Sequence, residues 1–228
     1  MVGDLAVYQD VAAAVAGVSA VLHLACVHGF ELRFENSIDA NFRGTVNVLD
    51  AMRAAEVKRL VYASSHHVLG LHPLEGFPGD TAELAPDAFY GLGKAFGEIA
   101  CGMYARRYGL KTLMIRIGNA DPQVSDARAL RLWTSARDLG QLVNIGLSHH
   151  DIGSNDIGYD VVYGVSRCAE PLFANRRAHE LGYRPQDIAE ENLASDYLPY
   201  EQMPQRLGRD FVGGGYTVVD LPQPEERE

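Results

Sequence analysis

The sequence has few of the features that mark exported or membrane-bound proteins. Its 228 residues include three cysteines, Cys26, Cys101 and Cys168, which lie far apart and form no C-x-x-C pair. This spacing indicates no metal or redox site, and we expect a reducing, cytoplasmic location. No stretch approaches the roughly 18 apolar residues that span a bilayer, and the first residues lack the basic-then-apolar order of a signal peptide.

Positive charge is also scarce. The chain has 20 Lys and Arg residues against 30 Asp and Glu residues, which gives a formal net charge of −10. Nucleic acids and anionic membrane surfaces both require a large basic surface, so neither is an expected partner. The length and the 47% hydrophobic content suffice for one globular core, and we expect a small-molecule ligand.

A glycine-rich phosphate-binding turn is the third absence. No predicted strand leads into a Gly-x-Gly-x-x-Gly or Gly-x-x-Gly-x-x-Gly turn that could hold a pyrophosphate at a helix amino terminus. The run Gly213-Gly214-Gly215 cannot substitute, because it lies near the carboxy terminus and no predicted helix follows it.

What the chain does contain is an alternation of short apolar runs and amphipathic segments. The alternation predicts a parallel sheet with crossover helices, and therefore an α/β fold. A loop over residues 70–86 is long enough to be functional. The expected strands cover residues 18–26, 59–64, 111–117 and 159–165, and the expected helices cover 36–55, 90–108 and 127–143.

Two polar motifs lie at the ends of these elements. Tyr90 and Lys94 are four residues apart on a predicted helix, and hence on one face of it. By itself this spacing is most often a solvated pair. Ser64 and Ser65, however, directly follow a predicted strand, and strand ends in such a sheet are where ligands bind. Together these residues indicate a site.

This order of motifs resembles the extended short-chain dehydrogenase/reductase family, also called the NAD-dependent epimerase/dehydratase family. The likeness rests on SSHHVLG after a strand, then YGLGK and RIGN, and it extends to Gly3-Asp4-Leu5, to His23-Leu24-Ala25, to residues 41–47 and to LGYRPQD at 181–187. It implies a Rossmann-type doubly wound sheet and an NAD cofactor. The resemblance implies cofactor contacts from Asp4, Leu5, Leu24, Ala25, Tyr90, Lys94 and Ile117.

Within the family, the chain most resembles uronate dehydrogenases, which oxidise a uronate at the anomeric carbon to an aldarolactone. Ser64-Ser65-His66-His67, residues 128–138 and residues 161–164 carry this likeness. His66, Asn119 and His28 depart from it, since Asn, Ser and a small hydroxyl residue are expected there. The resemblance implies substrate contacts from Ser65, His66, His67, Asn119, Arg128 and His28.

The chemistry assigns each catalytic residue a role. Tyr90 is the expected base, and a phenol needs its pKa lowered to serve near neutral pH. We expect Lys94, together with the nicotinamide charge, to lower that pKa. Ser65 would hold the reacting oxygen. Arg128 could clamp the substrate carboxylate with two parallel hydrogen bonds, or it could belong to the wet face of its helix.

The resemblance also implies that the family's Gly-rich turn precedes Met1, so we expect a fragment with weakened NAD binding and an unpaired strand edge at residues 20–24. Residues 1–125 and 158–168 would form a partial NAD-binding domain, and 126–157 and 169–228 a small substrate region.

Two alternatives stay open, a sugar-nucleotide epimerase or dehydratase and a non-catalytic remnant that no longer binds NAD. We expect a homodimer or higher homo-oligomer through helices 36–55 and 90–108, and no metal, because His149-His150-Asp151 is interpreted as a loop.

Overall fold

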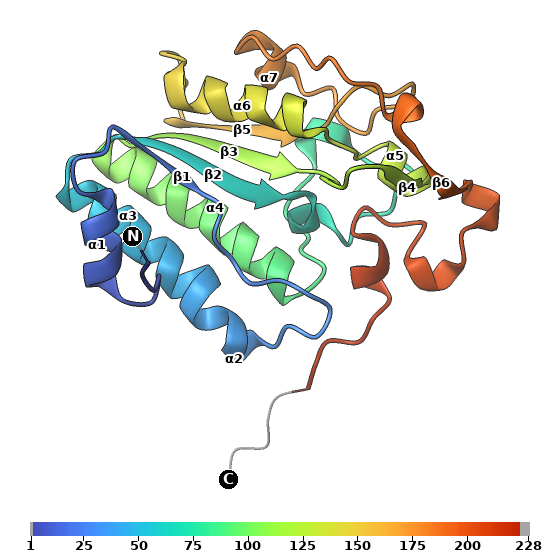
Figure 1. The fold of residues 1–228 in the computed structure, drawn as a ribbon, viewed down its shortest axis with the longest axis horizontal. Helices are drawn as coiled ribbons and strands as arrows, with labels where there is room; N and C mark the ends of the chain where they lie inside the picture. Colours follow the sequence, from blue (N-terminus) through green and yellow to red (C-terminus); the bar gives the residue numbers. More distant parts are fainter. Residues whose placement is uncertain (1, 224–228) are drawn as a thin grey trace.

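Four parallel strands form the central sheet of the structure, a computed structural model that describes residues 2–223 (Figure 1). Their order is β1-β2-β3-β5, and every neighbouring pair is parallel. Ser65 at the end of β2 lies opposite Ile117 of β3, which lies opposite Gly164 of β5. The carboxyl ends of three strands therefore meet along one edge. The strands are β1 (Ala20–His23), β2 (Arg59–Ser65), β3 (Lys111–Ile117) and β5 (Tyr159–Gly164).

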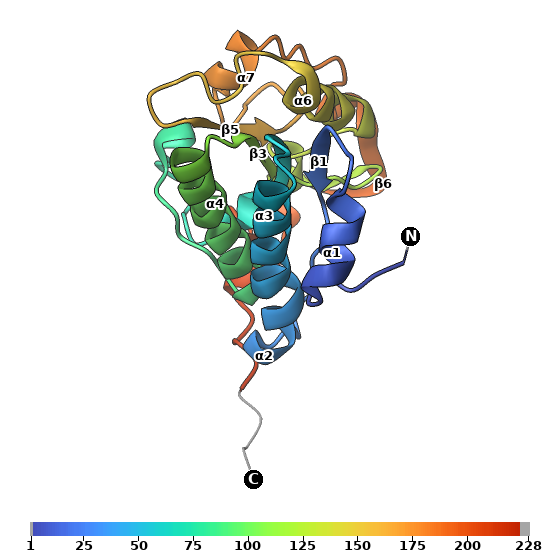
Figure 2. The same cartoon turned by 90° about the vertical axis from the view of Figure 1, so that its left-hand side faces the viewer.

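Helices cover both faces of this sheet, as in a doubly wound fold (Figure 2). On one face lie α1 (Tyr8–Val15), α3 (Gly44–Ala54) and α4 (Phe89–Tyr108), and on the other lies α6 (Ala136–Ser148). One apolar cluster, which includes Leu49, Met52 and Met114, fills the first interface. A second, which includes Leu113, Leu142 and Ile145, fills the other. The α/β sheet predicted from the alternation is confirmed.

Shorter elements complete the chain. The strands β4 (Val124–Asp126) and β6 (Leu193–Leu198) pair in parallel in a second, two-stranded sheet. The remaining helices are α2 (Phe34–Ser37), α5 (Ala127–Leu130) and α7 (Arg176–Glu180), with a π-helical turn, η1, over Ile38–Arg43 and single helical turns at η2 (His66–Leu69), η3 (Gly79–Thr81), η4 (Ala189–Asn192), η5 (Tyr200–Gln202), η6 (Gln205–Leu207) and η7 (Gly214–Thr217).

The expected long helix over 127–143 is wrong, because two helices with separate caps occupy this region. The Asp126 side chain accepts from the amide of Ala129 and starts α5, while Ser135 accepts from the amide of Asp138 and starts α6. Between them the chain turns, and Trp133 forms an isolated bridge with Asn119, whose amide donates to the carbonyl of Leu132 and whose carbonyl accepts from the amide of Thr134. Two N-cap side chains so close together specify two helix starts.

Helix α4 leaves its larger apolar side chains in solvent. Ile99 and Met103 are 65% and 50% exposed. The helix instead presents small residues to the sheet, and a Cβ at Gly97 would lie 1.9 Å from the Tyr62 hydroxyl. Small residues let the helix approach the sheet closely, which leaves the larger side chains outside.

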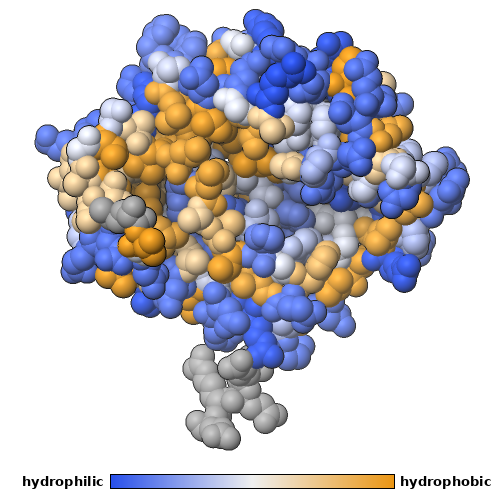
Figure 3. Space-filling model, viewed as in Figure 1, coloured by the Kyte–Doolittle hydropathy of each residue, from blue (hydrophilic) through white to orange (hydrophobic). Residues whose placement is uncertain are grey.

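The strand β1 lies at the edge of the sheet, so the predicted unpaired edge is confirmed for the described residues. Leu22 and Leu24 are 37% and 55% exposed. Figure 3 shows that apolar side chains gather on the face where β1 and α6 lie. Within residues 2–223, no helix has the length and apolar character that a bilayer crossing requires.

Candidate active site

Ser65, Tyr90 and Lys94 meet at the carboxyl end of β2. Ser65 is the last residue of β2, and Tyr90 and Lys94 lie one turn apart at the start of α4. The Ser65 hydroxyl lies beside the Tyr90 phenol and favours its ionised form. The Lys94 ammonium lies 5.8 Å from the centre of the Tyr90 ring and donates to the carbonyl of Ala63 at 2.6 Å. A phenol, a hydroxyl and an ammonium therefore face one another.

The close approach of α4 to the turn after β2 brings these groups together. Ala88 is extended and Phe89 opens the helix. A Cβ at Gly91 would lie 2.5 Å from the carbonyl oxygen of His67, a distance that no side chain tolerates. Glycine at this position therefore allows the first turn of α4 to contact η2 and places Tyr90 against Ser65.

Burial dominates the electrostatics of the site. It raises the pKa of Tyr90 to about 12, against the opposing effect of the Ser65 hydrogen bond. Burial also lowers the pKa of Lys94, and the nearby Cys26 thiol counters that shift. Among the protein's own groups, the cost of burying a phenolate outweighs the effects that favour it. That Lys94 together with the nicotinamide charge lowers the Tyr90 pKa stays a prediction.

Aromatic rings surround the Tyr90 phenol. The ring centres of His28 and His67 lie 5.9 Å and 5.5 Å from that of Tyr90, both in edge-on arrangements. Tyr216 of η7 packs on His67 at 4.5 Å and on Phe30 at 4.3 Å. The loop after β1 and the carboxy-terminal turn η7 therefore meet beside Tyr90. Sequence reasoning missed Phe30 and Tyr216, because both lie in segments without periodicity.

The expected substrate residues His67 and Arg128 lie near a buried carboxylate, Asp87. The Nδ1 atom of His67 is 2.6 Å from Oδ2 of Asp87. Arg128 is half-buried rather than on a wet helix face, and it donates to the carbonyl of Val212 at 3.0 Å. The positive charge of Arg128 lowers the pKa of both His67 and Asp87. Asp87 was also missed, although its place just before α4 and next to Tyr90 was a signal.

Two other expected residues, His66 and Asn119, are held by backbone contacts. His66 is 6% exposed, and its Nδ1 atom lies 3.1 Å from the carbonyl oxygen of Ile117. Burial lowers the pKa of His66 well below the usual range, so the ring is neutral at physiological pH. Asn119 is half-buried and its backbone pairs with the segment around Trp133. Both residues lie just beyond strand ends, His66 after β2 and Asn119 after β3.

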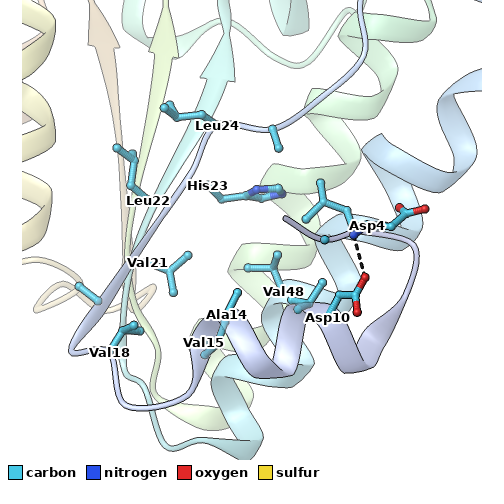
Figure 4. Close-up of a pocket in the computed structure, with 15 residues that line it drawn as sticks. Asp4, Asp10, Ala14, Val15, Val18, Val21, Leu22, His23, Leu24 and Val48 are labelled. Atoms are coloured by element: carbon cyan, nitrogen blue, oxygen red, sulfur yellow. Dashed lines mark hydrogen bonds between the residues drawn. The ribbon is translucent and has the colours of Figure 1, made fainter. Parts of the chain in front are cut away.

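The expected cofactor residues Asp4, Leu5, Leu24 and Ala25 line one pocket of about 520 Å³ beside β1 (Figure 4). Val15, Val21 and Val48 contribute to its apolar lining. The amide of Asp4 donates to the Asp10 carboxylate at 2.9 Å. From this pocket, Leu24 and Ala25 lead directly to Cys26, which contacts the Lys94 ammonium.

These residues fit the two ends of a dinucleotide. At one end, the Lys94 ammonium and the Tyr90 phenol are groups that can hydrogen-bond the hydroxyls of a ribose. At the other, the Asp4 carboxylate can accept hydrogen bonds from an amine or a hydroxyl within an apolar pocket. The described lining of the pocket contains two carboxylates, Asp4 and Asp10, and no lysine or arginine, so it offers no cation to a pyrophosphate.

The loop His149-His150-Asp151 brings three atoms of the metal-ligating kind within 4.8 Å of one another. They are already engaged within the loop. The amide of Asp151 donates to Nδ1 of His149 at 3.2 Å, and Nε2 of His150 lies 3.4 Å from the Asp151 carboxylate. The cluster lies outside the site around Tyr90.

Comparisons with known proteins agree with this geometry. A model of the NAD dependent epimerase/dehydratase family matches residues 1–120. A uronate dehydrogenase from Pseudomonas putida is 37% identical over 220 residues, which cover 95% of this chain and 78% of that protein. Two solved structures also superpose on this fold. A mutant uronate dehydrogenase from Agrobacterium tumefaciens complexed with NAD has a TM-score of 0.84 and 29% identity, covering 98% of this chain and 83% of that chain. A glucuronic acid dehydrogenase from Chromohalobacter salexigens has a TM-score of 0.84 and 28% identity, covering 97% and 82%.

Proposed function

This chain belongs to the NAD dependent epimerase/dehydratase family, and from that premise we propose that it is an NAD-dependent dehydrogenase that oxidises a free uronate at its anomeric carbon to an aldarolactone. The observation that supports this most directly is the contact of Ser65, Tyr90 and Lys94 at the end of β2. Relatives that carry the name uronate dehydrogenase supply the substrate class.

Tyr90 is the proposed base. Its phenolate would take the proton of the C1 hydroxyl while the hydrogen on C1 leaves as a hydride, and the C1–O bond becomes the carbonyl of the lactone. Bound NAD would supply the hydride acceptor. Ser65 would donate a hydrogen bond to the reacting oxygen and hold it beside the phenol. Such positioning lowers the activation barrier by several kcal/mol. Lys94, held by the carbonyl of Ala63, would keep a positive charge beside the phenolate.

Arg128 is the proposed partner of the uronate carboxylate. One guanidinium nitrogen, Nη1, already donates to the carbonyl of Val212, which leaves other N–H groups for a carboxylate. A guanidinium can meet both carboxylate oxygens at once. Arg128 is half-buried among Asp87, His67 and η7, so it would hold the uronate carboxylate near Tyr90. A neutral sugar would bind poorly, because it would leave the Arg128 guanidinium without a partner.

The test measures NADH formation from glucuronate and galacturonate with the wild type and two phenol variants. Tyr90→Phe should lower kcat by about a hundredfold or more, in the range for loss of a general base. Tyr104→Phe is the matched control, because this phenol lies on the same helix but donates to Asp50, away from the site. Failure of both uronates to reduce NAD would refute the proposal, and equal rates with neutral aldoses would refute the role of Arg128.

A further inference from the structure

Asp87 occupies a cavity that only glycines leave open. Its side chain is 0% exposed. A Cβ at Gly70 would lie 1.9 Å from its carboxylate, one at Gly213 2.0 Å, and one at Gly91 2.9 Å. Three separate segments of the chain therefore lack side chains where they surround this one carboxylate. Such enclosure fixes the carboxylate in place.

The described partner of this carboxylate is His67, whose ring faces the site. Oδ2 of Asp87 contacts Nδ1 of His67 at 2.6 Å, while Oδ1 is buried without a hydrogen bond. The His67 ring packs against Tyr90 and Tyr216. Its other nitrogen, Nε2, makes no hydrogen bond within residues 2–223. Since the two ring nitrogens point in different directions, binding Nδ1 on the buried side leaves Nε2 free for another partner.

The charges around the pair determine where the proton lies. Burial raises the pKa of Asp87 to about 7 and lowers that of His67 to about 3. The Arg128 guanidinium favours the charged carboxylate, while His66 is neutral and the phenols of Tyr90 and Tyr216 also face the carboxylate. At pH 8 the carboxylate is ionised and the imidazole is neutral. The single proton of the contact then belongs to Nδ1, because an ionised carboxylate can only accept.

We propose that Asp87 is a positioning residue that keeps the ring proton of His67 on Nδ1, so that the bare Nε2 accepts a hydrogen bond from a substrate hydroxyl beside Tyr90. The role in substrate binding rests on the proposed function, whereas the tautomer of His67 does not. Asp87→Asn, which removes the hydrogen bond between His67 and a charged carboxylate, should reduce kcat/KM about tenfold to a hundredfold.

The first test reads the tautomer directly. Nitrogen-15 NMR of the imidazole rings at pH 8, with His67 assigned by its loss in His67→Gln, should show a protonated Nδ1 and an unprotonated Nε2 in the wild type. Asp87→Asn should shift His67 toward the other tautomer. Asp160→Asn is the matched control, because this side chain is also 0% exposed but pairs with Arg177, and it should leave the His67 resonances unchanged.

The second test separates positioning from mere support of the fold. Asp87→Asn should raise KM for the uronate more than it lowers kcat and leave KM for NAD unchanged. In a His67→Gln background, Asp87→Asn should have little further effect, since the two residues act as a unit. A purely structural role would instead give losses that multiply and that alter both KM values.

Each outcome either supports or overturns the positioning role of Asp87. A wild-type ring with its proton on Nε2 at pH 8 would overturn the proposal, and so would multiplicative losses in the double variant. If Asp87→Asn does not fold, the tautomer of the wild type alone decides. If no uronate is oxidised while Nδ1 carries the proton, the proposed function fails and the assignment of Asp87 to the His67 tautomer stands.

Discussion

The Ser65 hydroxyl beside Tyr90 opposes the effect of burial and so helps the proposed base to ionise. With a pKa of about 12, the phenol gives up its proton at pH 8 at a cost of about 5 kcal/mol, since one pKa unit is about 1.4 kcal/mol. A hydrogen bond to a charged oxygen contributes about 1.5 to 3 kcal/mol. Ser65→Ala should therefore move the acid limb of the profile of kcat/KM against pH upward by about one to two units.

The neighbouring serine provides the matched control. Ser64 is just as buried, but it donates to Glu98 at 2.5 Å on the opposite face of the strand. Initial rates of NADH formation are measured from pH 5 to pH 10 with saturating NAD. Ser65→Ala should lose about tenfold to a hundredfold in kcat/KM across the acid limb, which stays parallel to that of the wild type, while Ser64→Ala should keep the wild-type limb. Coincident limbs for Ser65→Ala and wild type would show that Ser65 does not assist ionisation of Tyr90.

Three further predictions concern stability and solubility. Glu98→Gln removes the carboxylate that accepts two hydrogen bonds from the buried Arg116, so the free energy of unfolding in urea should fall by about 3 to 5 kcal/mol. A fall below about 1 kcal/mol would contradict an ion pair that is shielded from water. The pKa of Asp87 in the folded protein, about 7, exceeds its ordinary 3.8, so the contribution of Asp87 to folding stability is complete below about pH 4 and is lost as the pH rises through 7. The stability of Asp87→Asn relative to wild type should therefore increase by on the order of 4 kcal/mol between pH 4 and pH 8. A difference that stays constant with pH would refute the raised pKa. Leu22→Lys adds charge to the exposed edge strand, and charge on an edge opposes edge-to-edge pairing, so light scattering should show less aggregation than in the wild type.

The elements that the sequence predicted well are those whose pattern is local. The strand over 111–117 was predicted at its observed bounds, and α4 and β2 to within one residue. In these segments, the apolar run or the helical spacing lies within the element itself. The predictions failed where a distant contact overrides the pattern, as for the helix over 127–143, which the pairing of Asn119 with the segment before Ser135 interrupts.

The same distinction separates the parts of the site. The sequence determined that Tyr90 and Lys94 share a face and that Ser65 ends a strand, because helical spacing and strand ends are properties of neighbouring residues. Only the tertiary structure decided that Asp87 would hold His67, and that Tyr216 would pack beside Phe30. These contacts join loops that carry no repeating pattern, and their geometry depends on how the glycines at 70, 91 and 213 let separate segments approach.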